Sequence, residues 1–297
     1  MILTPDCTES QWMTPLPGCT ALVATRNRWN LLVGRALPSI RRQTRAVREV
    51  VVVNDGTPFE AEKEAALRRL LHPLPLVMLD NRRTPGAAGA WNTGLEHLLA
   101  LSRAGFVALL DDDDSWEASH IEDNLRVAVR ERADVVVSGL RLVVDGQERE
   151  RPLPDGLLPG DFLVGNPGWQ GSNTFVSRRL WATVQGFRDG LRSLNDRDLA
   201  IRLLRVPGSR VAYTSRWTAT WYLSTQGDSL SSPRSPAKIS GLRWFWRLYG
   251  GEMSPVQAVA FLSRAESLFG VRRTEIEADG EDVPPHQLPW GDLHGFV

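Results

Sequence analysis

The sequence predicts an α/β protein built on a mostly parallel β-sheet, with extra helices near its C-terminal end. Three observations indicate this fold class. Short apolar runs alternate with segments of helical periodicity in the first half. Each of these runs ends in a polar or charged cluster. The second half has a mixed pattern in which strand and hairpin signals come before a glycine- and proline-rich stretch and several helical segments.

The first half contains four apolar runs that we expect to be buried strands of one sheet. Strands that are apolar on both faces are typical of parallel sheets covered by helices on both sides. The segments between these runs have apolar residues at helical spacing, as covering helices would. The four runs are residues 20–24, 50–53, 76–79 and 106–110.

A polar cluster follows each of these four strands. Ligands of open α/β sheets bind beyond the carboxyl ends of the strands, and those ends lie along one edge. Four clusters in succession therefore predict a binding site along that edge. The clusters are residues 25–28 (TRNR), 54–56 (NDG), 80–83 (DNRR) and 111–114 (DDDD).

The chain beyond residue 132 differs in pattern from the first half. A proline- and glycine-rich stretch at 151–171 is suited to a loop that lines a cleft. The motif SSPRSP at 231–236 is typical of a linker. The other predicted elements are a strand at 133–138, a hairpin arm with an Asp-Gly turn at 141–146, and helices at about 195–205, 237–249 and 255–270.

Composition excludes several classes of function. Lys and Arg together number 35, as do Asp and Glu, so no net positive field exists to hold a nucleic acid backbone. No run approaches the roughly 18 apolar residues that span a bilayer. The N-terminus also lacks the pattern of a secretory signal. We therefore expect a cytoplasmic protein without an integral membrane segment.

The acidic cluster at 111–114 is the strongest chemical signal. A helix cap needs one acid, and further carboxylates beside it repel one another unless a cation relieves the repulsion. Magnesium and manganese prefer oxygen ligands and use few protein carboxylates when phosphates complete the shell. A metal-linked role is thus predicted for Asp111, Asp112 and Asp113. Asp114 is either a helix N-cap, with Glu117 three residues later, or a further ligand.

These residues resemble the family-two glycosyltransferases, which have the GT-A fold, over roughly residues 20–232. The segment 110–116 (LDDDDSW) resembles the DxD motif of that family, and 53–57 (VNDGT) resembles its second-strand motif. The segment 86–94 (GAAGAWNTG) resembles the glycine-rich turn and helix start after the third strand. The resemblance implies an inverting enzyme that transfers sugar from a nucleotide diphosphate, with Mn²⁺ or Mg²⁺ as cofactor.

The resemblance also implies roles for single residues. Asp113 would be the principal metal ligand, and Asp111 would approach the metal or the ribose. Asp55 would contact the nucleobase or ribose of a UDP-, dTDP- or GDP-linked sugar. The other donor-binding residues expected along this edge are Thr25, Arg26, Asn27, Arg83, Gly86, Asn92 and Asp112.

A second family signature lies in the other half. Residues 185–188 (QGFR) and 194–199 (LNDRDL) resemble the family's "GGF … ED.dL" segment, which implies that Asp196 is the catalytic base. Ser193 is a candidate N-cap of that helix, and Asp198 is expected to pair with a nearby Arg. The candidate acceptor contacts are Trp169, as an exposed residue of its loop, and Trp221.

The segment 221–231 (WYLSTQGDSLS) resembles a mobile loop that often carries a metal-binding His in the family, but no His occurs in it. Gln226 or Asp228 would then substitute, or the metal would rest on Asp113 and phosphate. The implied organisation is a nucleotide-sugar-binding half (1–132), an acceptor-binding and catalytic half of the same domain (133–231), and a helical extension and tail (232–297). Two roles stay open for the tail, which are covering the cleft and forming a homodimer.

Two other functions stay open. A nucleotidyltransferase that makes sugar nucleotides would need a glycine-rich loop after the first strand, and residues 25–28 contain no glycine. A non-catalytic nucleotide-sugar-binding protein would tolerate the loss of Asp196, which is present. The absence of membrane segments favours a soluble acceptor, which would be a natural product, a peptide or the end of a glycan.

Overall fold

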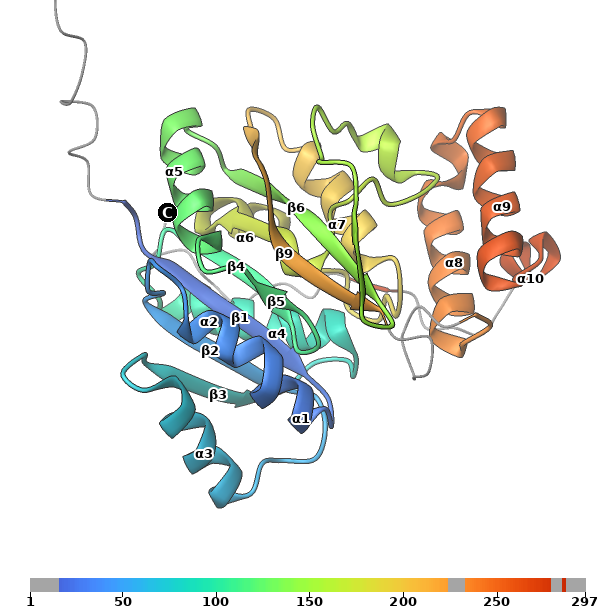
Figure 1. The fold of residues 1–297 in the computed structure, drawn as a ribbon. Helices are drawn as coiled ribbons and strands as arrows, with labels where there is room; N and C mark the ends of the chain where they lie inside the picture. Colours follow the sequence, from blue (N-terminus) through green and yellow to red (C-terminus); the bar gives the residue numbers. More distant parts are fainter. Residues whose placement is uncertain (1–15, 224–232, 279–284, 287–297) are drawn as a thin grey trace, which may run out of the picture.

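The computed structural model describes residues 16–223, 233–278 and 285–286. Figure 1 shows a twisted central sheet with helices on both faces. Helices α8, α9 and α10 stand together beyond α7, on the side of the molecule away from β3. Within the described ranges, no helix has both the length and the apolar character that crossing a membrane requires. Gln226 and Asp228 lie outside the described residues.

The four predicted strands form the parallel part of the sheet. The central strand β1 pairs on one side with β2 and on the other with β4, so that Val23 lies between Val52 and Leu110. β3 lies at the outer edge, beside β2. The four carboxyl ends therefore lie along one edge, as predicted. These strands are β1 (Cys19–Thr25), β2 (Glu49–Asn54), β3 (Leu76–Asp80) and β4 (Phe106–Asp111).

The second half continues the same sheet with mixed pairing. In the described chain the sheet has nine strands in the order β3-β2-β1-β4-β8-β6-β9-β5, with β7 paired to β6. β8 is antiparallel to β4 and β6, whereas β9 is parallel to β6. These strands are β5 (Ser115–Trp116), β6 (Val135–Val144), β7 (Gln147–Glu150), β8 (Thr174–Ser177) and β9 (Val211–Leu223).

The second-half strands correct part of the sequence prediction. Residues 133–138 and 141–146 were expected as a strand and a separate hairpin arm, but β6 is one continuous strand through both. The predicted Asp-Gly turn is confirmed, since Asp145 and Gly146 both have positive φ and join β6 to β7. β8 and β9 were not predicted. β9 includes Trp221, which was expected in a loop.

Helices cover both faces of the sheet and complete two apolar cores. On one face, α4 packs so closely that a Cβ on Gly94 would lie 2.3 Å from Leu22 Cδ1, so a glycine is required there. α5 and α2 cover the other face. The elements before β6 are α1 (Trp29–Leu31), a π-helical turn (Leu32–Ala36), α2 (Leu37–Arg41), α3 (Ala61–Leu71), α4 (Ala87–Leu101) and α5 (His120–Glu131).

The later helices predicted at 195–205, 237–249 and 255–270 agree closely with the structure, whereas the helices Arg178–Val184 and Arg273–Glu277 were not predicted. Ser235 and Ser254 cap α8 and α9, each followed by a proline at the first helical position, which is a strong start signal. The short α10 contacts α8 through Arg243, which donates to the carbonyl of Glu275. These helices are α6 (Arg178–Val184), α7 (Asn195–Leu204), α8 (Pro236–Tyr249), α9 (Pro255–Phe269) and α10 (Arg273–Glu277). Short 3-10 turns lie at Pro159–Phe162, Gly171–Asn173 and Gly250–Glu252.

Candidate active site

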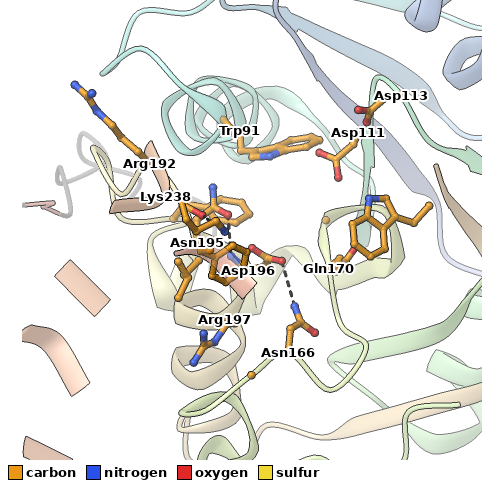
Figure 2. Close-up of a pocket in the computed structure, with 18 of the residues that line it drawn as sticks. Trp91, Asp111, Asp113, Asn166, Gln170, Arg192, Asn195, Asp196, Arg197 and Lys238 are labelled. Carbon is orange, nitrogen blue, oxygen red and sulfur yellow. Dashed lines mark hydrogen bonds between the residues drawn. The ribbon is translucent and has the colours of Figure 1, made fainter. Parts of the chain in front are cut away.

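A cavity of about 290 Å³ lies at the carboxyl edge of the sheet, between the two halves of the chain. It is lined by the end of β4, the start of α4, the loop 165–171, the start of α7, and side chains from α8 and α9. Four of the predicted site residues meet in it, namely Asp111, Asp113, Asp196 and Trp221. Figure 2 shows Asp111 and Asp113 across the pocket from Asp196.

The acidic end of the pocket is a crowded group of carboxylates. Asp111 ends β4, and Ser172 donates to its Oδ2 at 3.2 Å. A Cβ on Gly171 would lie 2.8 Å from the same oxygen, so only glycine allows this close approach. Burial and the charges of Asp113, Asp112 and Asp196 raise the pKa of Asp111 to about 8. This repulsion is what a bound cation would relieve.

Asp113 faces the same cavity and is paired with an arginine. Arg28 Nη1 donates to Asp113 Oδ2 at 2.6 Å and lies 3.4 Å from Asp112 Oδ1. Arg28 itself lines the pocket. The guanidinium therefore supplies positive charge beside the acidic cluster, at the position where the sequence predicts a metal ion.

Asp114 is not a helix cap. Its carboxylate is buried, contacts the hydroxyl of Ser172, and accepts a hydrogen bond from the backbone N of Tyr222 at 3.1 Å. Residues 115–116 form β5, and α5 begins only at His120, with Ser119 at its N-cap position. The expected cap is wrong because this segment joins the sheet beside β9 before the helix begins. Asp114 instead ties the acidic turn to β9.

The predicted base Asp196 lies in the first turn of α7. Asn166 Nδ2 donates to Asp196 Oδ2 at 3.2 Å and also to the carbonyl of Trp169 at 2.6 Å, so it joins the base to the loop 165–171. Burial raises the pKa of Asp196, although Lys238 and Arg197 act in the opposite direction. A carboxylate with a raised pKa at the edge of a cavity is suited to accept a proton.

Asp198 has the structural role that was expected of it. It is fully buried and accepts hydrogen bonds from Arg188 Nε at 2.8 Å, Arg202 Nε at 2.9 Å and the Tyr249 hydroxyl at 2.7 Å. The predicted Asp–Arg pair is therefore confirmed. Ser193 does not cap α7, because the N-cap residue is Leu194 in a left-handed conformation. The Ser193 hydroxyl accepts from Lys238 instead.

Four expected donor residues, Arg26, Asn27, Asp55 and Gly86, lie together beside the pocket. We call this group the rim. Asp55, just after β2, accepts hydrogen bonds from Gly86 N at 2.8 Å and from Asn81 Nδ2 at 2.6 Å. Arg26 lies 3.7 Å from the same carboxylate and is largely exposed. Asn27 accepts from the backbone N of Thr57. The rim joins the ends of β1, β2 and β3, but its side chains do not line the described cavity.

The side chains of four other expected donor-binding residues form hydrogen bonds or ion pairs within the protein. Thr25 and Asp112 are buried and bonded to each other at 2.6 Å. Both amide atoms of Asn92 bond the backbone of Phe187. The side chain of Arg83 is 7% exposed, and its guanidinium pairs with buried Asp189 at 2.8 Å. None of these four side chains lines the described cavity, and their contact with the donor stays a prediction.

The two tryptophans predicted to contact the acceptor, Trp169 and Trp221, differ in position. Trp169 is 1% exposed and donates from Nε1 to Thr174, so the expectation that it is exposed is wrong. It anchors its loop from inside and does not line the cavity. Trp221 does line the cavity, as does Trp91. No role was predicted for Trp91, whose indole forms a wall of the pocket.

Several residues that line or build the pocket could not be assigned from the sequence. They are Arg28, Asn166, Ser172, Arg192, Lys238 and Arg264. The available signals were weak. Asn166 lies within the predicted cleft loop and Ser172 directly follows it. Lys238 is one of only two lysines in an arginine-rich chain, with Lys63 the other.

The residues at the acidic end fit a divalent cation that shares its ligands with a phosphate. Among the described residues no group of three or more His, Cys, Asp or Glu is arranged to hold a metal ion. Asp111 and Asp113 nevertheless both offer carboxylate oxygens to the cavity. Magnesium is commonly bound by one or two carboxylates, with substrate phosphates and water as the other ligands.

The fold is the GT-A fold predicted from the sequence, and solved structures of low sequence identity share it. The structure of S. aureus TarS residues 1–349 in complex with UDP-GlcNAc superposes with a TM-score of 0.63 at 16% identity, covering 89% of this chain and 77% of that chain. The mannosyltransferase PcManGT from Pyrobaculum calidifontis, in complex with GDP-Man and Mn²⁺, has a TM-score of 0.53 at 19% identity, covering 85% and 70%. Both similarities support the predicted fold.

The sequence comparisons identify the family. The sequence model of the family "Glycosyl transferase family 2" matches residues 20–203, so this chain belongs to that family. An uncharacterized glycosyltransferase of Haemophilus influenzae is 24% identical over 181 residues, 58% of this chain and 57% of that protein. The succinoglycan biosynthesis protein ExoW of Rhizobium meliloti is 35% identical over 104 residues, 35% and 31% of the two chains. The chain thus spans less than two thirds of either relative.

Proposed function

We propose that this protein is an inverting glycosyltransferase that moves a sugar from a nucleoside diphosphate donor to an acceptor nucleophile, with a divalent cation. The observation that carries the proposal is that Asp111, Asp113 and Asp196 line one cavity. Cation-binding acids and a proton acceptor are the two groups that such a transfer needs, and they come from segments 80 residues apart or more in the sequence.

Asp196 acts as the general base in this proposal. It removes the proton of the acceptor hydroxyl as the oxygen attacks the anomeric carbon. The new carbon–oxygen bond forms while the bond to the diphosphate breaks on the opposite face, so a single displacement inverts the anomeric carbon. Asn166 fixes the orientation of the Asp196 carboxyl group through its 3.2 Å hydrogen bond.

Asp111 and Asp113 hold the leaving-group end. Their carboxylates would hold a divalent cation, which when bound would supply positive charge to the departing diphosphate. Arg28, already bonded to Asp113, adds a second positive charge at the same place. The rim around Asp55 then lies along the strand ends, where a nucleoside would be bound in an α/β sheet.

The structures with similar folds support a choice of donor and metal. The crystal structure of TarS is in complex with UDP-GlcNAc, and the structure of PcManGT is in complex with GDP-Man and Mn²⁺. We therefore propose a uridine- or guanosine-linked sugar with Mn²⁺ first, and a dTDP-linked sugar or Mg²⁺ next. The proposed acceptor remains a natural product, a peptide or the end of a glycan.

The direct test is turnover of a donor panel by the purified full chain. UDP-GlcNAc, UDP-glucose, GDP-mannose and dTDP-glucose are incubated with Mn²⁺, Mg²⁺ or EDTA, and the released nucleoside diphosphate is measured. We expect release from donors of one base, in Mn²⁺ or Mg²⁺ but not in EDTA. Absence of binding and of release with every donor would overturn the proposal.

The same assay separates the two alternative functions. A nucleotidyltransferase would release pyrophosphate from a nucleoside triphosphate and a sugar 1-phosphate. A non-catalytic binding protein would bind a donor and release no nucleoside diphosphate over hours, with or without acceptor extracts. Neither result is expected.

A further inference from the structure

The pocket contains a second charged region, which we name the basic subsite and define as Arg192, Lys238 and Arg264. Arg192 lies just before α7, Lys238 on α8 and Arg264 on α9, and all three line the same cavity as the acids. In Figure 2, Asp111 and Asp113 lie to one side of Asp196, and Arg192 and Lys238 lie to the other. The charge of the pocket therefore changes sign across the proposed base.

Lys238 is the buried centre of this subsite. It is 6% exposed, and its Nζ donates to Ser193 Oγ at 2.8 Å and lies 4.4 Å from the ring centre of Phe269. Among the described residues no carboxylate is within ion-pair distance of it. An ammonium group has three donors, so at least two of its N–H groups have no hydrogen-bond acceptor among the described residues.

Burying an ammonium group without a counter-ion is unfavourable. Burial lowers the pKa of Lys238 to about 8, with Asp196 partly opposing this and Arg197 adding to it. Arg197 is itself buried and donates to the carbonyls of Phe162 and Leu163, so it adds positive charge without a bonded carboxylate. A ligand anion entering this part of the cavity would receive hydrogen bonds and remove the unfavourable state.

Arg264 and Arg192 provide the exposed side of the subsite. The guanidinium of Arg264 packs beside Gly165, whose added Cβ would lie 3.5 Å from Arg264 Nε. Within the described chain the side chain of neither arginine makes a hydrogen bond or an ion pair. Guanidinium groups bind phosphate and carboxylate groups through two parallel hydrogen bonds. The combination of a buried lysine and two available arginines is thus suited to an oxyanion.

The position of the subsite indicates which substrate carries the anion. In a single displacement the nucleophile, the anomeric carbon and the leaving oxygen are in line, so acceptor and diphosphate lie on opposite sides of the transferred sugar. The acids mark the diphosphate side, and the basic subsite lies beyond Asp196 from them. We propose, on the basis of the proposed function, that the basic subsite binds a phosphate or carboxylate group of an anionic acceptor.

The test is a binding comparison with three sugars that differ only in charge. Glucose, glucose 6-phosphate and glucuronate are titrated calorimetrically into the full chain, with Mn²⁺ and UDP or GDP present. We expect at least about tenfold tighter binding of one or both anions than of glucose, the scale of one charged hydrogen bond. Comparing the affinities for glucose 6-phosphate and glucuronate shows whether the subsite prefers a phosphate or a carboxylate group.

Variants assign the effect to the subsite. Lys238→Met should remove at least about tenfold of the anion affinity, and Arg264→Gln, at an exposed position, should reduce it several-fold without affecting folding. Arg247→Gln is the matched control, because it removes one positive charge from α8 outside this cavity and should change nothing. Circular dichroism confirms that each variant is folded.

Two outcomes would overturn the proposal. One is that wild-type protein binds neither anion more tightly than glucose. The other is that Lys238→Met and Arg264→Gln weaken UDP or GDP binding as much as they weaken anion binding, which would assign the subsite to the donor. Failure of the proposed function is a separate result, seen when the wild type binds no nucleotide and releases none from any donor.

Discussion

Asp196 and Asp198 lie two residues apart on α7, yet their surroundings give them different roles. Asp198 is enclosed by two arginines and a tyrosine, each bonded to its carboxylate. Asp196 lines the cavity, and its carboxylate is held by Asn166. A substitution at Asp196 should therefore affect chemistry, whereas the same substitution at Asp198 should affect stability.

The replacement Asp196→Asn should abolish the base, because the amide that replaces the carboxylate has nearly the same size but cannot accept the proton. We expect turnover of the donor and acceptor to fall at least about a hundredfold, the scale of a lost general base. The affinity for nucleoside diphosphate should stay within about twofold of wild type, since Asp196 lies away from the acidic end. Steady-state turnover and calorimetry measure the two quantities, and near-normal turnover would place the base elsewhere.

The pH dependence of turnover should report the same residue. Asp196 must be ionised to accept a proton, and burial raises its pKa from the ordinary value of 3.8. Turnover should therefore rise with increasing pH through a value above 3.8 and be lost as the pH falls below it. A kcat/KM profile of wild type and Asp196→Glu checks this, because the rising limb should move in the variant. An identical limb in both proteins would exclude Asp196 as its source.

Single residues were predictable where a local motif contained them. Asp111, Asp113 and Asp196 belong to short patterns whose spacing fixes their place at the end of a strand or the start of a helix. Lys238 and Asn166 were not predictable, because their roles depend on Ser193 and Asp196, which lie 45 and 30 residues away. Trp169 shows the opposite error, since a glycine-rich loop can still bury its largest side chain.

At the scale of elements, Asp198 joins α7 to α8 and to the segment before it. Tyr249 ends α8, and Arg188 precedes α7, so one buried carboxylate connects three pieces of chain. Its loss would leave two arginines close together with no counter-charge. These contacts hold the first turn of α7, and with it Asp196, against the cavity.

We expect Asp198→Ala to lower the free energy of unfolding by about 3–5 kcal/mol, the effect of breaking a buried ion pair from one side. Urea denaturation followed by circular dichroism measures the change. Asp196→Asn is the control on the same helix and should change the value by less than about 1 kcal/mol. Equal stability of the two variants would contradict the anchoring role of Asp198.

Elements were predictable where periodicity or caps were strong, and not where the backbone is irregular. The four buried runs became β1 to β4, and the helices predicted at 237–249 and 255–270 became α8 and α9, which begin after capping serines followed by prolines. β9 was not predicted, because its pairing with β6 shifts register around Gly139 and because Ser215 has a positive φ. Its exposed and buried residues therefore do not alternate regularly.

At the scale of the whole molecule, the cavity lies between the two halves of the chain. Its walls come from β4 and α4 on one side and from α7, α8 and α9 on the other. The parallel half was predictable from apolar runs alone, but the arrangement of the C-terminal helices around Asp196 depends on long-range contacts that leave no local pattern. This is why the basic subsite was found only in the structure.

Because the ligand would contact both halves, binding should stabilise the entire fold. Nucleoside diphosphate with Mn²⁺ at a hundred times the dissociation constant should add about 2.7 kcal/mol to the free energy of unfolding. Thermal unfolding with nucleotide, Mn²⁺ or both measures this. We expect the pair together to raise Tm by more than the sum of the separate shifts, and a strictly additive result would argue against a shared site.

The central claim is that the acids at the end of β4 bind a cation together with the diphosphate. Calorimetric titration of UDP and GDP into wild type and Asp113→Asn, each in Mn²⁺ and in EDTA, tests it most directly. We predict that Mn²⁺ strengthens nucleotide binding to wild type at least about tenfold and that Asp113→Asn loses this gain. An equal response to Mn²⁺ in both proteins would contradict the account.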